Sequence, residues 1–314
     1  MPPVDKLHQE YWMGVESYSD FWYNVADKLD EGDGGTSSIF HVIRSAYKSD
    51  RETVAKGGGI SYVMKIVTED SSELNSRLNA EQDFLSETDH PSILNCFDNG
   101  DWHGYPFYIA EFLPGTLRQS MERNLSQAIK LNISIQLVSA IVELEQSEPS
   151  VVHRDIKPRN IFISGNRAVL GDFGIMKFLD GDREEIEDIW ENSTQKAMPY
   201  YYPTPDLVAY SNDNQDLTTK ANVYQLGLVL AEMFTGTNPA SPATMTDGDL
   251  EYNSRDDVSY VPGGYGSNIH DLLTRMLNEE TADRPNATEI LQEWEEIMAG
   301  VAESTYDLNG FVFE

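Results

Sequence analysis

The chain has 314 residues, 40% of them hydrophobic, which is enough for one large domain or for two lobes with separate cores. It carries 53 acidic and 22 basic residues, a net charge of −31, which argues against nucleic-acid binding through a basic face. Three explanations of this acidity are compatible with the sequence: a strongly solvated surface suited to a high-salt cell, a preference for a basic substrate or partner, or an effect on solubility alone.

No segment has the features of a membrane span or of a secretion signal. The longest apolar run, 226–234, contains Glu232 and is too short to cross a bilayer. The first 14 residues lack the apolar core of a signal peptide. The single cysteine, Cys96, permits no intrachain disulfide, and its apolar surroundings predict a small buried side chain. We therefore expect a cytoplasmic protein with no membrane partner.

The first third of the chain is rich in predicted strands. Residues 1–20 show no clear period, and we expect them to form an N-terminal extension. A strand is predicted over 21–29, and a glycine-rich turn followed by a β-branched strand over 29–43. The polar stretch 47–59 contains three glycines and predicts a loop, which leads to a strand over 60–67.

The rest of the chain is predominantly helical. A helix is expected over 70–86, where Asp and Ser caps precede a helical pattern, and a further strand over 106–112. Four more helical segments follow, over 125–146, 222–236, 268–278 and 287–300. Strands followed by helices, without alternation, are typical of an α+β fold.

A lysine and a glutamate in this first third are candidates for a buried ion pair. Both faces of the strand that carries Lys65 are apolar, so its ammonium group needs a counter-charge. Glu81 falls on one helical stripe with three leucines, Leu74, Leu78 and Leu85. The pattern predicts that Lys65 pairs with Glu81; the alternative is a solvated Glu81 at the edge of the stripe.

Three further motifs carry groups suited to phosphate chemistry. Gly32 and Gly34 lie in a turn between two predicted strands, where backbone N–H groups can approach a polyphosphate, although such a turn alone is usually a plain hairpin. Asp155 and Asn160 in HRDIKPRN, with Asp172 in LGDFG, are hard oxygen ligands that suit Mg²⁺. Phosphoryl transfer requires a metal held by carboxylates, a lysine on the phosphates and a group that orients the nucleophile.

With these motifs in this order, the sequence resembles the eukaryotic-type protein kinases over about residues 29–298. The matching features are the glycine-rich loop, the lysine of VMKIV, the glutamate nine residues before HP, HRDIKPRN, DFG twelve residues after its asparagine, YPTPD in place of Ala-Pro-Glu, NVYQLG and DRP. The resemblance implies a bilobal protein-kinase-like fold. A small antiparallel-sheet N-lobe (21–112) would precede a larger helical C-lobe (113–300) and a tail (301–314), with ATP and Mg²⁺ bound between the lobes.

The resemblance also implies a role for each motif residue. Asp155 would orient or deprotonate the substrate hydroxyl, and Lys157 would neutralise the transferring phosphoryl group. Asn160 and Asp172 would hold Mg²⁺, and Lys65, paired with Glu81, would hold the α- and β-phosphates. The nucleotide would be contacted by Gly32, Gly34, Ile39, Val63, Lys65, Glu111, Leu113 and Phe162.

Several positions depart from the family pattern. Ser37 stands for the third glycine, and Asn222 stands for an aspartate, offering one acceptor oxygen, which predicts some loss of rigidity in the catalytic loop. Asp206 replaces the usual glutamate and is expected to pair with Arg284 at a longer reach. The usual Gly-Thr is missing from 196–206, so serine/threonine specificity is inferred mainly from the place of Lys157.

Two positions bear on regulation and inhibitor binding. Arg154 precedes Asp155, and in the family such an arginine meets a phosphate, for which Ser193 and Thr194 are candidates. The carboxylates of 180–191 could instead dock on Arg154, or that stretch could be a solvated loop. Ala110, before the expected hinge, predicts an open pocket behind adenine.

These observations predict an ATP- and Mg²⁺-dependent protein kinase that phosphorylates serine or threonine of protein substrates. The alternative is a pseudokinase acting as a nucleotide-binding scaffold, which Asn222 and the missing Gly-Thr favour and the intact Lys65, Asp155, Asn160 and Asp172 oppose. A kinase-fold enzyme acting on a small molecule is opposed by HRDIKP and by the helices after residue 222.

Overall fold

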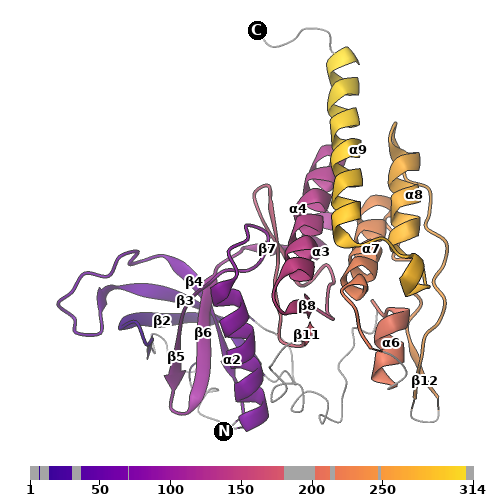
Figure 1. The fold of residues 1–314 in the computed structure, drawn as a ribbon. Helices are drawn as coiled ribbons and strands as arrows, with labels where there is room; N and C mark the ends of the chain where they lie inside the picture. Colours follow the sequence, from indigo (N-terminus) through magenta and orange to yellow (C-terminus); the bar gives the residue numbers. More distant parts are fainter. Residues whose placement is uncertain are drawn as a thin grey trace. The chain divides into compact units, whose positions relative to one another are not determined.

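The computed structural model describes residue 7 and residues 14–29, 37–69, 71–179, 202–212, 216–246 and 249–308. The described residues divide into two compact units, one up to Leu113 and one from Pro114 (Figure 1). We call them the sheet unit and the helical unit. The expected α+β class, with a sheet-rich first part and a helix-rich remainder, is confirmed.

The sheet unit is built on one six-stranded antiparallel sheet with the order β1-β2-β3-β4-β6-β5. Its elements are β1 (Gly14–Glu16), β2 (Phe21–Lys28), β3 (Ser37–Lys48), β4 (Ser61–Val67), α2 (Ser72–Glu87), β5 (Cys96–Trp102) and β6 (Tyr105–Glu111). The strands predicted over 21–29, 60–67 and 106–112 and the helix over 70–86 are confirmed. The sequence pattern did not predict β5, nor β1, which adds an edge strand from within the expected N-terminal extension.

The sheet is curled so that its two edge strands meet. The N–H of Tyr18, just after β1, donates to the carbonyl of Asn99 in β5 at 2.9 Å. Gly100 permits this approach, because a Cβ there would lie 2.5 Å from the ring of Phe107 and 3.0 Å from the carbonyl oxygen of Glu16. The curl encloses an apolar core made by Leu7, Val15, Tyr23, Val25, Phe40, Val42, Tyr62, Met64, Ile66, Phe107 and Ile109.

The loop predicted over 47–59 is confirmed, except that β3 continues to Lys48; the residues after it form turns and bends with a single bridge between Tyr47 and Val54. The N–H of Lys48 donates to the carbonyl of Thr53 at 2.8 Å, and the N–H of Ala55 donates to the carbonyl of Ala46 at 2.9 Å. The guanidinium of Arg44 donates to the carbonyl of Lys56 at 3.1 Å and so holds the loop against β3. The strand that was predicted to end at residue 43 is longer than expected because residues 44–48 show no apolar alternation.

Helices dominate the helical unit. Its helices are α3 (Leu117–Met121), α4 (Gln127–Gln146), α6 (Pro205–Ser211), α7 (Lys220–Thr235), α8 (Gly266–Met276), the 3-10 turn η1 (Thr281–Asp283) and α9 (Ala287–Leu308). Its short strands are β7 (Gly115–Thr116), β8 (Ser150–Val152), β9 (Ile161–Ser164), β10 (Arg167–Leu170), β11 (Lys177–Leu179), β12 (Thr244–Thr246) and β13 (Asp249–Glu251). The four helices predicted after residue 125 are therefore confirmed, with ends shifted by a few residues, most at the C-terminal end of α9.

The core of the helical unit is centred on α4 and α7. Among the described residues α4 alone is long and apolar enough, by length and composition, to cross a membrane. Its apolar side chains are used in the core, where it packs beside α9, α7 and β10 (Figure 1). Every residue of α7 from Ala221 to Phe234 is buried, so a polar residue within that stretch must find a partner inside the protein.

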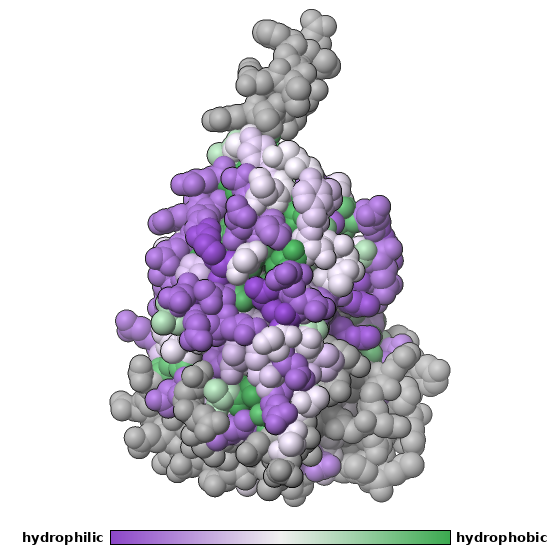
Figure 2. Space-filling view, turned by 90° about the vertical axis from the view of Figure 1, so that its right-hand side faces the viewer, coloured by the Kyte–Doolittle hydropathy of each residue, from purple (hydrophilic) through white to green (hydrophobic). Residues whose placement is uncertain are grey.

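Among the coloured residues of the face drawn in Figure 2, hydrophilic residues predominate, with hydrophobic patches between them. Such a surface agrees with a strongly solvated protein.

Candidate active site

The predicted ion pair between Lys65 and Glu81 is present in the sheet unit. The ammonium of Lys65 in β4 lies 2.9 and 2.8 Å from the two carboxylate oxygens of Glu81 in α2. Their exposed fractions are 7% and 1%, so neither charge is left to solvent. The hydroxyl of Tyr108 also donates to Glu81, at 3.1 Å, which holds the carboxylate in place. The alternative of a solvated Glu81 is excluded.

Two of the residues expected to contact adenine, Ile39 and Val63, lie on the same sheet face as Lys65. Ile39 is the register partner of Lys65, and Val63 lies two residues before Lys65 on the same strand. Glu111 ends β6 and Leu113 follows it, both partly exposed. Ile39 and Val63 are also partly exposed, which leaves apolar surface for a flat ligand.

Three other residues expected to contact the nucleotide lie in the helical unit or outside the described residues. Phe162 belongs to the helical unit, in β9, where it is partly exposed and pairs with Thr116 and Val169. Gly32 and Gly34 lie outside the described residues.

Cys96, expected to be a small buried side chain, is partly buried, and burial raises the pKa of its thiol to about 12.

The helical unit gathers two of the predicted catalytic residues and one predicted metal ligand into one hydrogen-bonded cluster. The ammonium of Lys157 lies 2.7 Å from Oδ2 of Asp155. The amide of Asn160 donates to the same Oδ2 at 2.8 Å and to the carbonyl of Asp155 at 3.0 Å. Within the described part of the chain, Oδ1 of Asp155 is buried and has no hydrogen-bond partner. The two side chains thus hold the carboxylate through one of its oxygens, Oδ2.

Burial sets the proton affinity of this carboxylate. Asp155 is 9% exposed, and this burial raises its pKa, with the negative charge of Asp172 acting in the same direction. Lys157 and Asn160 oppose the shift, because both donate to the ionised form. A raised pKa makes a carboxylate a better proton acceptor.

His153 orients the backbone on which Asp155 sits. Its Nδ1 accepts the N–H of Asp155 at 3.2 Å, and its Nε2 lies 3.2 Å from the carbonyl of Gly171, an arrangement that assigns the proton to Nε2. The ring is fully buried against Phe173, with centroids 4.4 Å apart. Burial lowers the pKa of His153 to about 4, so the ring stays neutral near neutral pH.

The residues expected to hold Mg²⁺ offer a suitable donor set. Nδ2 of Asn160 faces Asp155. The other amide atom of Asn160, Oδ1, makes no hydrogen bond among the described residues and could therefore coordinate a metal ion. Asp172 is exposed, with a backbone φ of 62°. No cluster of three or more His, Cys, Asp or Glu occurs in the described ranges. A carboxylate and an amide oxygen fit Mg²⁺, which commonly takes one or two protein ligands and completes its shell with phosphate oxygens and water.

Asn222, which replaces an aspartate of the family pattern, is fully used. Its Oδ1 accepts the N–H of His153 at 2.8 Å, and its Nδ2 donates to the carbonyl of Val151 at 2.8 Å. The expected loss of one acceptor is therefore offset by a new donor that also fastens the backbone before Asp155.

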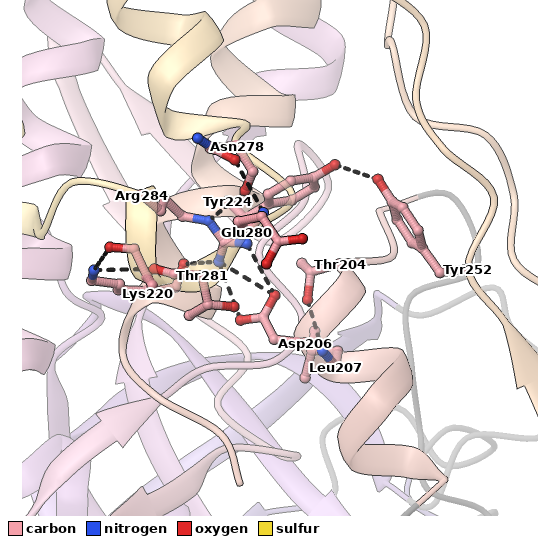
Figure 3. Close-up of polar contacts among 11 residues, drawn as sticks. Thr204, Asp206, Leu207, Lys220, Tyr224, Tyr252, Asn278, Glu280, Thr281 and Arg284 are labelled. Atoms are coloured by element: carbon pink, nitrogen blue, oxygen red, sulfur yellow. Dashed lines mark hydrogen bonds and ion pairs between the residues drawn. The ribbon is translucent and has the colours of Figure 1, made fainter. Parts of the chain in front are cut away.

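The expected pair of Asp206 and Arg284 is present and completely buried (Figure 3). The guanidinium lies 3.2 to 3.3 Å from both carboxylate oxygens of Asp206. It also donates to the carbonyls of Lys220 at 2.7 Å and Asn278 at 3.1 Å, and lies 4.7 Å from the centroid of the Tyr224 ring. The shorter aspartate thus makes the contact, tying α6 to α7 and to the segment before α9.

Arg154 is 6% exposed and has a backbone φ of 69°. Its guanidinium carbon lies 5.6 Å from the centroid of the Tyr210 ring, to which the ammonium of Lys177 also comes within 5.2 Å. Its expected partners, Ser193, Thr194 and the acidic stretch 180–191, lie outside the described residues, so the regulatory hypothesis stays a prediction.

Two groups of contacts were missed from the sequence. The hydroxyl of Tyr202 donates to Glu232 of α7, and Arg118 pairs with the same carboxylate at 2.7 Å. Gln225, also in α7, is fully buried and hydrogen-bonds to the backbone beside Asp155. The available signal was a polar residue inside the apolar run NVYQLGLVL.

Comparison with known proteins agrees with this geometry. The family model described as protein kinase domain matches residues 32–294. The serine/threonine-protein kinase PrkC of Bacillus subtilis is 30% identical over 213 residues, which cover 66% of this chain and 30% of that protein. A probable LRR receptor-like serine/threonine-protein kinase of Arabidopsis thaliana is 28% identical over 234 residues, covering 70% and 23%. The serine/threonine-protein kinase tousled-like 1 of Caenorhabditis elegans is 25% identical over 302 residues, covering 90% and 29%. The chain thus spans less than a third of the length of these three relatives.

Proposed function

Since this chain belongs to the protein kinase family, we propose that it transfers the γ-phosphoryl group of ATP to serine or threonine hydroxyls of protein substrates. The observation that carries the proposal is the cluster around Asp155, in which Lys157 and Asn160 hold one carboxylate oxygen and leave the other unpartnered among the described residues. A scaffold that only binds nucleotide has no need of such a cluster.

In the proposed reaction Oδ1 of Asp155 accepts the hydrogen bond of the substrate hydroxyl and orients its oxygen toward the γ-phosphorus. The raised pKa of Asp155 favours taking up the proton as the new O–P bond forms, while the bond between the γ-phosphorus and the bridging oxygen of ATP breaks and ADP leaves. Lys157, already beside Asp155, neutralises charge on the transferring group. Mg²⁺, for which Asn160 and Asp172 are the proposed ligands, would neutralise the phosphates.

Lys65 is the proposed partner of the α- and β-phosphates. Glu81, whose carboxylate is itself held by Tyr108, keeps Lys65 in one position before nucleotide binds, so little side-chain ordering is required at that moment. Ile39 and Val63 on the same sheet face are proposed to cover the adenine ring.

Two observations support serine and threonine as acceptors. Lys157 follows Asp155 by two residues, as in the pattern on which the sequence prediction rests. Relatives of 25% to 30% identity carry the name serine/threonine-protein kinase. The activities of their remaining segments are not carried over to this chain.

The test is transfer of labelled γ-phosphate from ATP–Mg²⁺ to basic and to acidic protein substrates, with wild type beside Asp155→Asn, at low and at molar potassium chloride. We expect transfer by the wild type, its loss in the variant, and label on serine or threonine in the hydrolysed product. Label confined to tyrosine would overturn the acceptor assignment. ATP binding without transfer at either salt concentration would establish the scaffold alternative. A preference for the basic substrate, or a requirement for salt, would assign a cause to the net charge of −31.

A further inference from the structure

One face of α7 points two side-chain amides at the loop that carries Asp155. Asn222 and Gln225 are three residues apart, so they lie next to each other on the helix surface. They are 1% and 0% exposed. Asn222 hydrogen-bonds to the backbone of Val151 and His153, as described above. Gln225 hydrogen-bonds to the backbone further along the loop, at Ile156.

Gln225 hydrogen-bonds to the backbone on both sides of the catalytic aspartate. Its Nε2 donates to the carbonyl of Arg154 at 2.9 Å, and its Oε1 accepts the N–H of Ile156 at 3.2 Å. The orientation of the amide is set by its surroundings, because a flipped amide would place Oε1 against carbonyl oxygens. The peptide groups before and after Asp155 are therefore both fixed by one side chain.

The backbone held in this way is strained. Arg154 has a φ of 69°, a conformation that is unfavourable for a residue with a side chain and persists only where its surroundings enforce it. The hydrogen bond from Gln225 to the carbonyl of Arg154 is one such constraint.

The same amide reaches a third segment. Nε2 of Gln225 also donates to the carbonyl of Tyr202 at 3.2 Å. The hydroxyl of Tyr202 donates to Glu232, which lies two turns further along α7. Both the carbonyl and the hydroxyl of Tyr202 thus hydrogen-bond to side chains of α7. Gln225 makes one of these bonds and also binds the loop around Asp155.

We propose that Gln225 is a positioning residue that sets the carboxylate of Asp155 for phosphoryl transfer and couples that setting to the segment at Tyr202. The proposal rests on the proposed function, because it concerns the geometry of the same aspartate. Asp155 touches the substrate, whereas Gln225 acts only through the backbone. Loss of the amide would let Asp155 shift, and a shift of a reacting group of the order of 1 Å costs up to about 100-fold in rate.

The test compares Gln225→Met, which keeps length and apolar packing, with a matched control, Gln136→Met. Gln136 in α4 makes the same kind of bridge, accepting from the N–H of Ala168 and donating to the carbonyl of Asn166, both at 2.8 Å. We expect Gln225→Met to lower kcat at least about ten-fold while the KM for ATP changes less than about two-fold. Gln136→Met should lower the unfolding temperature without that loss of kcat. An unchanged kcat in Gln225→Met, or an equal loss in Gln136→Met, overturns the proposal.

Two further measurements cover the cases in which the first comparison fails. If Gln225→Met does not fold, the isosteric Gln225→Glu replaces it, since a carboxyl group has at most one proton and cannot donate to both Arg154 and Tyr202, and it should show the same selective loss of kcat. Hydrogen exchange of the Ile156 amide tests whether Gln225 holds the loop around Asp155, independently of phosphoryl transfer. We expect this amide to exchange at least about ten-fold faster in the Gln225 variant, while exchange of the α4 amides stays unchanged. If the wild type transfers no phosphoryl group but exchange is faster in the Gln225 variant, the proposed function fails while the role of Gln225 in holding the loop is supported. Unchanged exchange refutes that role.

Discussion

The buried pair of Asp206 and Arg284 offers a sharp test of how the helical unit is held together. Both side chains are at most 1% exposed, and the guanidinium is enclosed by Asp206, two backbone carbonyls and the Tyr224 ring (Figure 3). Asp206→Ala leaves this cation buried without a counter-charge. Breaking a buried pair in this way costs about 3–5 kcal/mol of unfolding free energy.

An exposed pair in the same unit provides the control. Arg275 and Glu293 join α8 to α9, but their side chains are 49% and 35% exposed. Water solvates both charges when the pair is broken, so Arg275→Ala should cost at most about 1 kcal/mol. The difference between the two variants therefore isolates the effect of burial on pairs of the same chemical type.

The assay is urea unfolding of wild type and variants followed by far-ultraviolet circular dichroism, which reports mainly on the helices. The double variant Asp206→Ala with Arg284→Met should recover part of the stability lost in Asp206→Ala, because no unpaired charge remains and the methionine can still pack on Tyr224. The reasoning is refuted if Asp206→Ala costs no more than Arg275→Ala, or if the double variant is less stable than Asp206→Ala by the full cost of a second independent site.

Three further predictions concern the site itself. Lys65→Met should lower kcat/KM for ATP-dependent transfer at least about 100-fold, and it should also lower the unfolding temperature, because Glu81 is left buried without its counter-charge; Glu81→Gln should lower kcat/KM less. Equal activity of Lys65→Met and wild type would remove this lysine from the mechanism. The pKa of His153 is lowered by burial to about 4 from its usual 6.5, so the unfolded chain binds the extra proton between these values and stability should fall by about 3 kcal/mol as the pH drops from 6.5 to 4. In His153→Asn the plot of unfolding free energy against pH should lose that part of its slope, and an unchanged slope would contradict the assignment. Ala110 is 1% exposed, and its small side chain should admit adenine-site inhibitors with a bulky substituent; a bulky compound that binds Ala110→Met as tightly as wild type would show that no such pocket is used.

Much of the site was predictable because its signals are local. Strand alternation placed Lys65 among apolar neighbours, and a helical stripe placed Glu81 inward, so the pair followed from two short-range patterns. The spacing within HRDIKPRN likewise predicted the grouping of Asp155 and Asn160, since five residues of one loop cannot lie far apart.

Other parts of the molecule depend on pairing between distant segments. The edge strand β1 has three residues and no alternation of its own, and its place is decided by its partners on β2 and by the contact of Tyr18 with Asn99. The extension of β3 from residue 44 to Lys48 was also missed, because these residues show no apolar alternation.

The sequence by itself determined the α+β class, the family and the candidates for the reacting groups, since these depend on residue types at fixed short spacings. Only the tertiary structure decided how those groups are held. Gln225 meets the loop around Asp155 across about 70 positions of the chain, and Asp206 meets Arg284 across 78, distances over which periodicity carries no information. Each contact is specified because an amide or a charge buried in a helix core must find its partner there, and the fold alone determines which partner is within reach.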